Sequence, residues 1–172
     1  LEDWPWPLRV YTLGRFKILR REKVLSFTGK VQKRPLELLQ ALIVMGGDDV
    51  PETSLLDLLW PDLDGCDAHN SLNMALHRLR KILGEKDAVR LSAGKLSLDR
   101  TKIWTDVWAM EERLTQAGSA WDDAQSAQAA QATRKALALF RGPLLPEVEM
   151  SWIISPRERI RYRLLRCLRS LG

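Results

Sequence analysis

The chain has 172 residues, of which 45% are hydrophobic, and it carries a net charge of +5 with a pI near 9.5. This length allows two small modules with hydrophobic cores, and the basic balance is compatible with an anionic partner. No apolar run approaches the ~18 residues of a membrane span, and the N-terminus does not resemble a signal peptide. Cys66 and Cys167 lie far apart, so a disulfide framework is not expected. We therefore expect a cytoplasmic protein without a membrane segment.

The residue pattern of the N-terminal third of the chain predicts a small antiparallel sheet followed by two helices. The first helix begins near Arg34, has Pro35 in its first turn and ends at Gly46-Gly47. The second has Glu52, Thr53 or Ser54 near its start and stops at Trp60-Pro61, because a residue before proline disfavours helical geometry. The three segments expected as strands are short and rich in β-branched or aromatic residues: Leu8–Leu13, Phe16–Leu19 and Val24–Phe27.

The most informative segment is a predicted helix over residues 68–83, with Asp67 as its N-cap and Gly84 just past its end. Leucines at steps of four, three and four form a buried stripe, and a polar face is left outside. The buried stripe consists of Leu72, Leu76, Leu79 and Leu83. The outward face consists of Asn70, Asn73, His77, Arg78 and Lys81. Asn and Arg match adenine and guanine edges, so this face suits a DNA groove. An ordinary solvated face is the alternative.

A hairpin is predicted over residues 89–98, after this helix. Two short apolar segments flank Ser92–Lys95, where Gly94 occupies a position that requires a positive φ. Lys95 then lies near the tip of the hairpin. The helix and the hairpin both fall within residues 67–103, which carry a net charge of +4.

Three helical segments are expected in the remainder, and alanines on one side of the second favour close helix packing. They are Val107–Leu114, Asp122–Phe140 and Pro156–Leu171. In the last helix we expect Ile160, Leu164, Cys167, Leu168 and Leu171 to point inward and Arg157, Arg159, Arg161, Arg163, Arg166 and Arg169 largely outward. We expect these arginines to be solvated or paired with acidic neighbours rather than to form a second DNA contact.

Sheet, helix, helix, helix and hairpin is the order of a winged helix. Four segments carry a closer resemblance: Leu13–Phe16, Arg34–Leu39, Leu58–Asp62 and Leu76–Gly84. On these segments, residues 8–103 resemble the winged-helix effector domain of OmpR/PhoB-type response regulators, above all the variant found in SARP-type activators of antibiotic pathways.

The segment Ala136–Leu145, followed by Trp152 and Pro156–Arg159, resembles the bacterial transcriptional activator domain of SARP-type proteins, which is tetratricopeptide-like. The expected fold class is therefore α+β. A winged helix-turn-helix occupies residues 1–103, with a small N-terminal sheet, three helices and a wing hairpin. An all-α tetratricopeptide-like module occupies residues 104–172. Because the module is short for its family, we expect either that the chain continues into further domains or that the protein itself ends early.

The resemblance implies a major-groove position for the third helix and a minor-groove position for the hairpin. Arg78 is then the main base reader, and Arg80 and Lys81 contact phosphates. The full set of residues implied at DNA is Asn70, Asn73, His77, Arg78, Arg80, Lys81, Trp60, Thr53, Lys95 and Arg90. For Trp60, simple core packing is an equally good interpretation.

Two positions depart from the pattern of the family. Response regulators often have a histidine at the position of Ala75, and many relatives have a basic residue at the position of Asn70. These departures weaken the transfer of any particular operator sequence from the family to this chain.

The predicted function is a sequence-specific DNA-binding transcriptional regulator, expected to be an activator. The resemblance implies double-stranded DNA with direct repeats, two copies of the chain on that DNA, and RNA polymerase as partners. The alternative is a protein-interaction module in which the winged helix and helical repeats are docking surfaces.

No enzymatic activity, cofactor or metal is expected. Cys66, His69 and His77 lack a fourth zinc ligand at a recognisable spacing. A phosphate-binding glycine loop and the usual nucleophilic constellations are also missing from the sequence.

Overall fold

The computed structural model describes residues 4–27 and 33–169, which group into two compact units. The N-terminal unit comprises the chain up to Arg9 together with Leu19–Ile103, and the C-terminal unit comprises Val10–Ile18 together with the chain from Trp104 onward. Each unit is therefore discontinuous in sequence. The expected domain limits, 1–103 and 104–172, stay a prediction.

A four-stranded sheet has the order β3-β2-β1-β7. Its strands are β1 Leu8–Tyr11, β2 Lys17–Arg20, β3 Lys23–Val24 and β7 Ile103–Thr105. β1 is shorter than the predicted Leu8–Leu13, because the N–H groups of Thr12 and Leu13 donate to the Asp106 carboxylate. The predicted strand Val24–Phe27 is wrong beyond Val24, where regular pairing ends.

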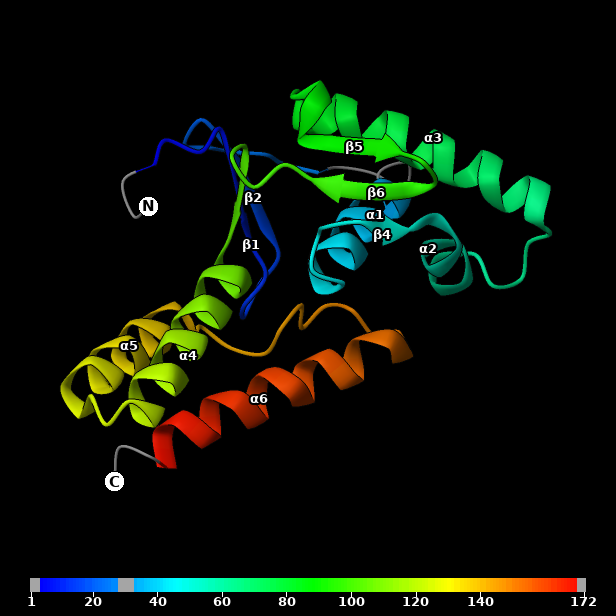
Figure 1. Ribbon diagram of the computed structural model, residues 1–172. Helices are drawn as coiled ribbons and strands as arrows, with labels where there is room; N and C mark the ends of the chain where they lie inside the picture. Colours follow the sequence, from blue (N-terminus) through cyan, green and yellow to red (C-terminus); the bar gives the residue numbers. More distant parts are fainter. Residues whose placement is uncertain (1–3, 28–32, 170–172) are drawn as a thin grey trace. The chain divides into compact units, whose positions relative to one another are not determined.

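The N-terminal unit places three helices beside a second small sheet (Figure 1). The helices are α1 Lys33–Val44, α2 Glu52–Leu59 and α3 Gly65–Leu83. The strands, in the order β4-β6-β5, are β4 Val50–Pro51, β6 Lys95–Leu98 and β5 Val89–Ser92, preceded by the 3-10 turn η2 Lys86–Ala88.

The core of this unit lies between α1, α2 and α3. Fully buried leucines from all three helices meet there, including Leu38, Leu55 and Leu79. The guanidinium of Arg34 joins α1 to the end of α2 by donating to the Leu59 carbonyl at 3.2 Å. The hairpin between β5 and β6 has the predicted turn, with Gly94 at φ 71° and Ser92 opposite Lys95.

The C-terminal unit contains α4 Asp106–Asp122, α5 Ser126–Leu139, the turn η3 Ser151–Ile153 and α6 Ile154–Arg169. Helices α4 and α5 lie side by side (Figure 1), and small buried residues such as Ala117 and Ala136 allow their close approach. The predicted helix Asp122–Phe140 is wrong at its start, because Ala124 adopts a positive φ of 58° and separates α4 from α5. Leu171, predicted to face inward, lies outside the described residues.

The segment Thr12–Gly14 belongs to this unit and forms its own pairing with the chain after α5. The N–H of Gly14 donates to the Pro143 carbonyl at 2.8 Å, and the N–H of Leu145 donates to the Thr12 carbonyl at 2.7 Å. Gly14 has a φ of 80°, and a Cβ there would lie 2.5 Å from the Arg141 carbonyl oxygen. Only glycine fits this position.

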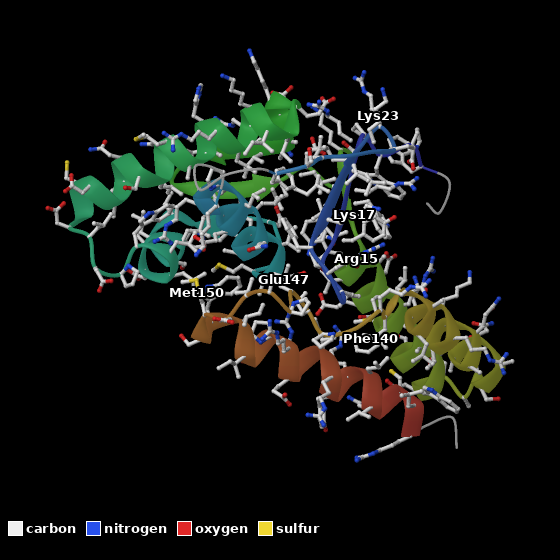
Figure 2. All side chains as sticks on the ribbon, turned by 180° about the vertical axis from the view of Figure 1, so that it is seen from behind. Arg15, Lys17, Lys23, Phe140, Glu147 and Met150 are labelled. Carbon is white, nitrogen blue, oxygen red and sulfur yellow. The ribbon has the colours of Figure 1, made fainter. Side chains whose placement is uncertain are left out.

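Phe16, between β1 and β2, is joined to the segment before α6. The N–H of Phe16 donates to the Glu147 carboxylate at 3.2 Å. Figure 2 shows Arg15 in the connection between β1 and β2, Lys17 at the start of β2, and Glu147 on the segment between α5 and α6.

Candidate nucleic-acid interface

Helix α3 begins three residues before the predicted start at residue 68. Its N-cap is Asp64 and not the expected Asp67: the Asp64 carboxylate accepts the N–H of Asp67 at 2.9 Å. Nothing in Gly65–Asp67 interrupts the helical hydrogen bonds, so the cap moves to the first residue able to make this bond. The predicted end of the helix at Gly84 is confirmed, because Gly84 has a left-handed backbone with φ 71° and its N–H donates to the Arg80 carbonyl.

The two faces of α3 are those predicted from the spacing. The leucine stripe is buried, and Asn70, Asn73, His77, Arg78 and Lys81 are all exposed. Asn70, Asn73, His77 and Lys81 follow one another at steps of three, four and four positions, and Arg78 lies three positions before Lys81, which places them as neighbours on one side of the helix. The helix therefore presents a continuous surface of amide, imidazole and cationic groups.

The cationic side chains of α3 differ in whether they are already bonded to other residues of the chain. The side chains of Arg78 and Lys81 form no ion pair or hydrogen bond with any described residue. Arg80, in contrast, is half-buried, and its Nε donates to the Val89 carbonyl at 2.9 Å, which connects α3 to strand β5. Arg78 and Lys81 are thus the α3 cations with the most freedom to meet an anion.

One outward residue was missed by the sequence reasoning. Met74 has 55% of its surface exposed, among the higher values for large apolar residues in the described chain. It lies four residues after Asn70 and four before Arg78, within the polar face. Its position outside the leucine stripe indicated that Met74 would be exposed. The polar residues around it drew the interpretation of this face toward hydrogen-bonding groups alone.

The cations of the hairpin are exposed but already paired with carboxylates. Lys95 Nζ lies 3.7 Å from Asp49 Oδ2, and Arg90 lies 3.9 Å from Asp99 Oδ2. The hydroxyl of Thr101 donates to Asp99 at 2.6 Å and lowers the pKa of that carboxyl below its ordinary value, with further lowering by Arg90 and Lys102. Contact of these cations with phosphate would compete with the internal pairs.

Thr53 and Trp60 lie at opposite ends of α2. Thr53 is exposed in the first turn, beside the acidic Glu52. Trp60 is the C-cap and only 8% exposed, yet its indole N–H has no hydrogen-bond partner among the described residues. The ring thus contributes to the core while its N–H remains available as a donor.

The arginines of α6 are not uniformly outward. The Arg157 guanidinium is half-buried and donates to the carbonyls of Leu144, Leu145 and Val148. This position was predicted wrongly, because the loop before α6 presents carbonyls that only a buried donor can satisfy. Arg159 and Arg163 pair with Glu111 on α4 at 3.3 and 3.5 Å, so pairing with acidic neighbours is confirmed for these two.

Two other classes of feature are missing from the part of the chain that the structure describes. Its histidines, cysteines and carboxylates do not gather into a group of three that could hold a metal ion. None of the described helices is long and apolar enough to cross a membrane.

Residues 105–172 match the family model described as the bacterial transcriptional activator domain, which is not an enzyme family. Among solved structures, the chain is similar to Mycobacterium tuberculosis EmbR, whose structure was determined in complex with a low-affinity phosphopeptide. The TM-score is 0.74 at 16% sequence identity, over 94% of this chain and 44% of that chain. This chain therefore spans less than half the length of the EmbR chain. A search of curated proteins found no match.

The family match supports the predicted resemblance for the C-terminal segment, while the OmpR/PhoB-type winged helix stays a prediction. At 16% identity, the likeness to EmbR concerns the fold. Residues 105–172 therefore match a bacterial transcriptional activator domain, and the chain has a mixed α+β fold similar to that of EmbR.

Proposed function

We propose that the chain is a sequence-specific DNA-binding transcriptional regulator of the SARP type that activates transcription. Its N-terminal part acts as a winged helix, with α3 in the major groove and the β5–β6 hairpin at the minor groove. The observation that carries the proposal is the outward face of α3, beside exposed Asn70, Asn73 and His77. There the side chains of Arg78 and Lys81 have no ion-pair or hydrogen-bond partner among the described residues. The activator-domain match of residues 105–172 supports the transcriptional role.

The proposed division of labour follows from the chemistry of these side chains. Arg78 reads a guanine edge, while the asparagines read adenine, because their donor and acceptor patterns match those bases in the major groove. Lys81 and the remaining Arg80 donors neutralise phosphates, which supplies salt-sensitive affinity. The indole N–H of Trp60 and the hydroxyl of Thr53 add backbone contacts that set the register.

The hairpin and the C-terminal unit complete the proposal. Lys95 or Arg90 reaches the minor groove after exchanging its carboxylate partner for phosphate. Residues 104–172 act as a tetratricopeptide-like module that contacts RNA polymerase. Two copies bind direct repeats about one helical turn apart, as dimeric helix-turn-helix proteins bind paired half-sites. Such a regulator would work in the cytoplasm.

The test is selection of bound duplexes from a random DNA library at near-physiological salt, followed by sequencing. We expect a repeated motif at a fixed spacing of about 10–11 base pairs. The alternative protein-interaction role is favoured instead if a well-folded chain enriches no motif and binds no duplex at low salt.

The selected duplex then allows a test of Arg78. Arg78→Ala should lose about 1–3 kcal/mol of discrimination between the selected and a random duplex. Arg134→Ala, which removes an exposed arginine from α5, is the matched control with the same change of charge. Equal losses in the two variants would contradict base reading by Arg78.

A further inference from the structure

Met74 is an apolar side chain on a face that is otherwise polar. It has 55% of its surface exposed, whereas Met110 in α4 is fully buried. On the helix its nearest outward neighbours are Asn70, His77 and Arg78, at separations of four, three and four residues. The side chain that the proposed function places at the middle of the DNA-facing surface is therefore a thioether.

Folding of α3 does not require this methionine. The helix is anchored by Leu72, Leu76 and Leu79, which have at most 3% of their surface exposed. Met74 points to the opposite side and leaves apolar area in water, which is unfavourable by roughly 25 cal/mol per Å² of such area. A ligand surface that covers it would recover this free energy.

The major groove offers one apolar group on its base edges, the 5-methyl group of thymine. An unbranched, polarisable thioether adapts well to such a small target. We propose that Met74 contacts a thymine methyl group and thereby contributes to the choice of DNA sequence. This inference rests on the proposed function, because it requires α3 to lie in the major groove.

The position on the helix also distinguishes Met74 from its neighbours. Arg78 and Asn73 can read bases through hydrogen bonds, and Lys81 is suited to phosphate. Met74 has no hydrogen-bond donor and only a weak sulfur acceptor, so it can discriminate only by shape and apolar contact. Its contribution should therefore disappear when the methyl group alone is removed from the DNA.

The experiment uses the selected duplex, with each thymine replaced in turn by deoxyuridine, which lacks only the methyl group. Dissociation constants are measured for the wild-type chain and for Met74→Ala. At one thymine per half-site, the wild-type chain should bind the deoxyuridine duplex about fourfold more weakly, since one methyl-sized group contributes ~0.8 kcal/mol and 1.4 kcal/mol is tenfold. Met74→Ala should bind both duplexes equally.

Met45→Ala is the matched control, because it removes another exposed methionine, 38% exposed, just after α1. It should keep the full wild-type response to deoxyuridine. The inference is overturned if the response at every thymine is the same in wild type and Met74→Ala, or if wild type shows no response. If either result is found while the wild-type chain still binds the unmodified duplex, only the role of Met74 is overturned and the proposed function stands. If the wild-type chain shows no specific binding to any duplex, the role of Met74 and the proposed function are both overturned.

Discussion

Lys95 Nζ, at the start of β6, lies 3.7 Å from the Oδ2 atom of Asp49, in the turn between α1 and β4. Asp49 holds a left-handed backbone with φ 48°, and its N–H donates to the hydroxyl of Ser97 at 2.9 Å, so the carboxylate is anchored beside the hairpin. The cation that the winged-helix proposal assigns to DNA thus has an internal competitor. If the proposal holds, its strength as a phosphate ligand would depend on Asp49, which lies 46 positions earlier in the chain.

Asp49→Asn should strengthen DNA binding, because it removes the carboxylate that competes with phosphate for Lys95. The pair is exposed, so the gain should be about 0.2–1 kcal/mol, measured by fluorescence anisotropy on the selected duplex. Asp57→Asn, an exposed aspartate on α2 with the same change of charge, is the control. An equal gain in that control would mean that only the total charge matters.

A companion measurement addresses Lys95 itself. Lys95→Ala should reduce the slope of log K against log salt by about 0.9, the value expected for one lost phosphate contact. When Lys95→Ala is already present, adding Asp49→Asn should not increase DNA affinity by more than the Asp57→Asn control does. An unchanged slope would place Lys95 away from the DNA backbone.

Leu79→Ala should destabilise the N-terminal unit by about 2–5 kcal/mol, because Leu79 is fully buried in the α3 stripe and truncation leaves a cavity. Met74→Ala, on the opposite side of the same helix, should change the free energy of unfolding by no more than about 0.5 kcal/mol. Urea denaturation followed by far-UV circular dichroism compares the two. Similar destabilisation by both variants would contradict the assigned faces of α3.

Asp106→Ala should strongly destabilise the C-terminal unit. The Asp106 carboxylate is buried and accepts the N–H groups of Thr12, Leu13 and Val107 at 2.8–3.0 Å, as well as the Thr12 hydroxyl. Burial raises the pKa of this carboxyl above its ordinary value, although the hydrogen bonds partly oppose the shift. Each donor left buried without a partner costs about 1–3 kcal/mol, so a loss of at least ~3 kcal/mol is expected.

The control for Asp106 is Asp122→Ala, which removes an exposed aspartate at the other end of α4. Thermal unfolding monitored by calorimetry should show a large decrease in melting temperature for Asp106→Ala and little change for Asp122→Ala. Comparable melting of the two variants would show that the Asp106 hydrogen bonds contribute little to stability.

The carboxyl of Asp99 should titrate below its ordinary pKa of 3.8, chiefly because the Thr101 hydroxyl donates to it. The folded state then binds fewer protons than the unfolded state in this range. The resulting stabilisation is fully present above the unfolded pKa and is lost as the pH falls through the lower folded pKa. Thr101→Val should raise the Asp99 pKa, as measured by NMR titration of the side-chain carboxyl.

Urea midpoints between about pH 5 and pH 2.5 provide the matching stability measurement. The decrease on acidification should be smaller in Thr101→Val than in the wild-type chain. Thr53→Val, which removes an exposed hydroxyl from α2, should titrate like the wild type. An unshifted Asp99 pKa in Thr101→Val would contradict the assigned cause.

Much of the candidate site was predictable because helical periodicity is local. The spacing of Leu72, Leu76, Leu79 and Leu83 determines which side of α3 is buried, and hence which side carries Asn73 and Arg78. Gly84 and Gly94 were equally predictable, since each occupies a backbone conformation that favours glycine. The roles of these residues at DNA stay predictions that the proposed experiments test.

The boundaries were less predictable, because a helix can begin at any of several acceptable caps. Asp64 and Asp67 are chemically identical, and only the hydrogen bond from the Asp67 N–H to Asp64 selects the earlier one. In the same way, the end of β1 depends on Asp106, 94 residues after Thr12.

The sequence by itself determined the order of the helices and of the β5–β6 hairpin, the two faces of α3, the hairpin turn and the similarity of the C-terminal segment to an activator domain. These properties depend on residue spacing and backbone preference, which act over a few residues. Only the tertiary structure decided that Val10–Ile18 group with the chain from Trp104 onward, that Lys95 meets Asp49 and that Arg157 turns toward three carbonyls. Such partners are chosen by long-range packing and by the need to satisfy buried polar groups, which a local pattern does not encode.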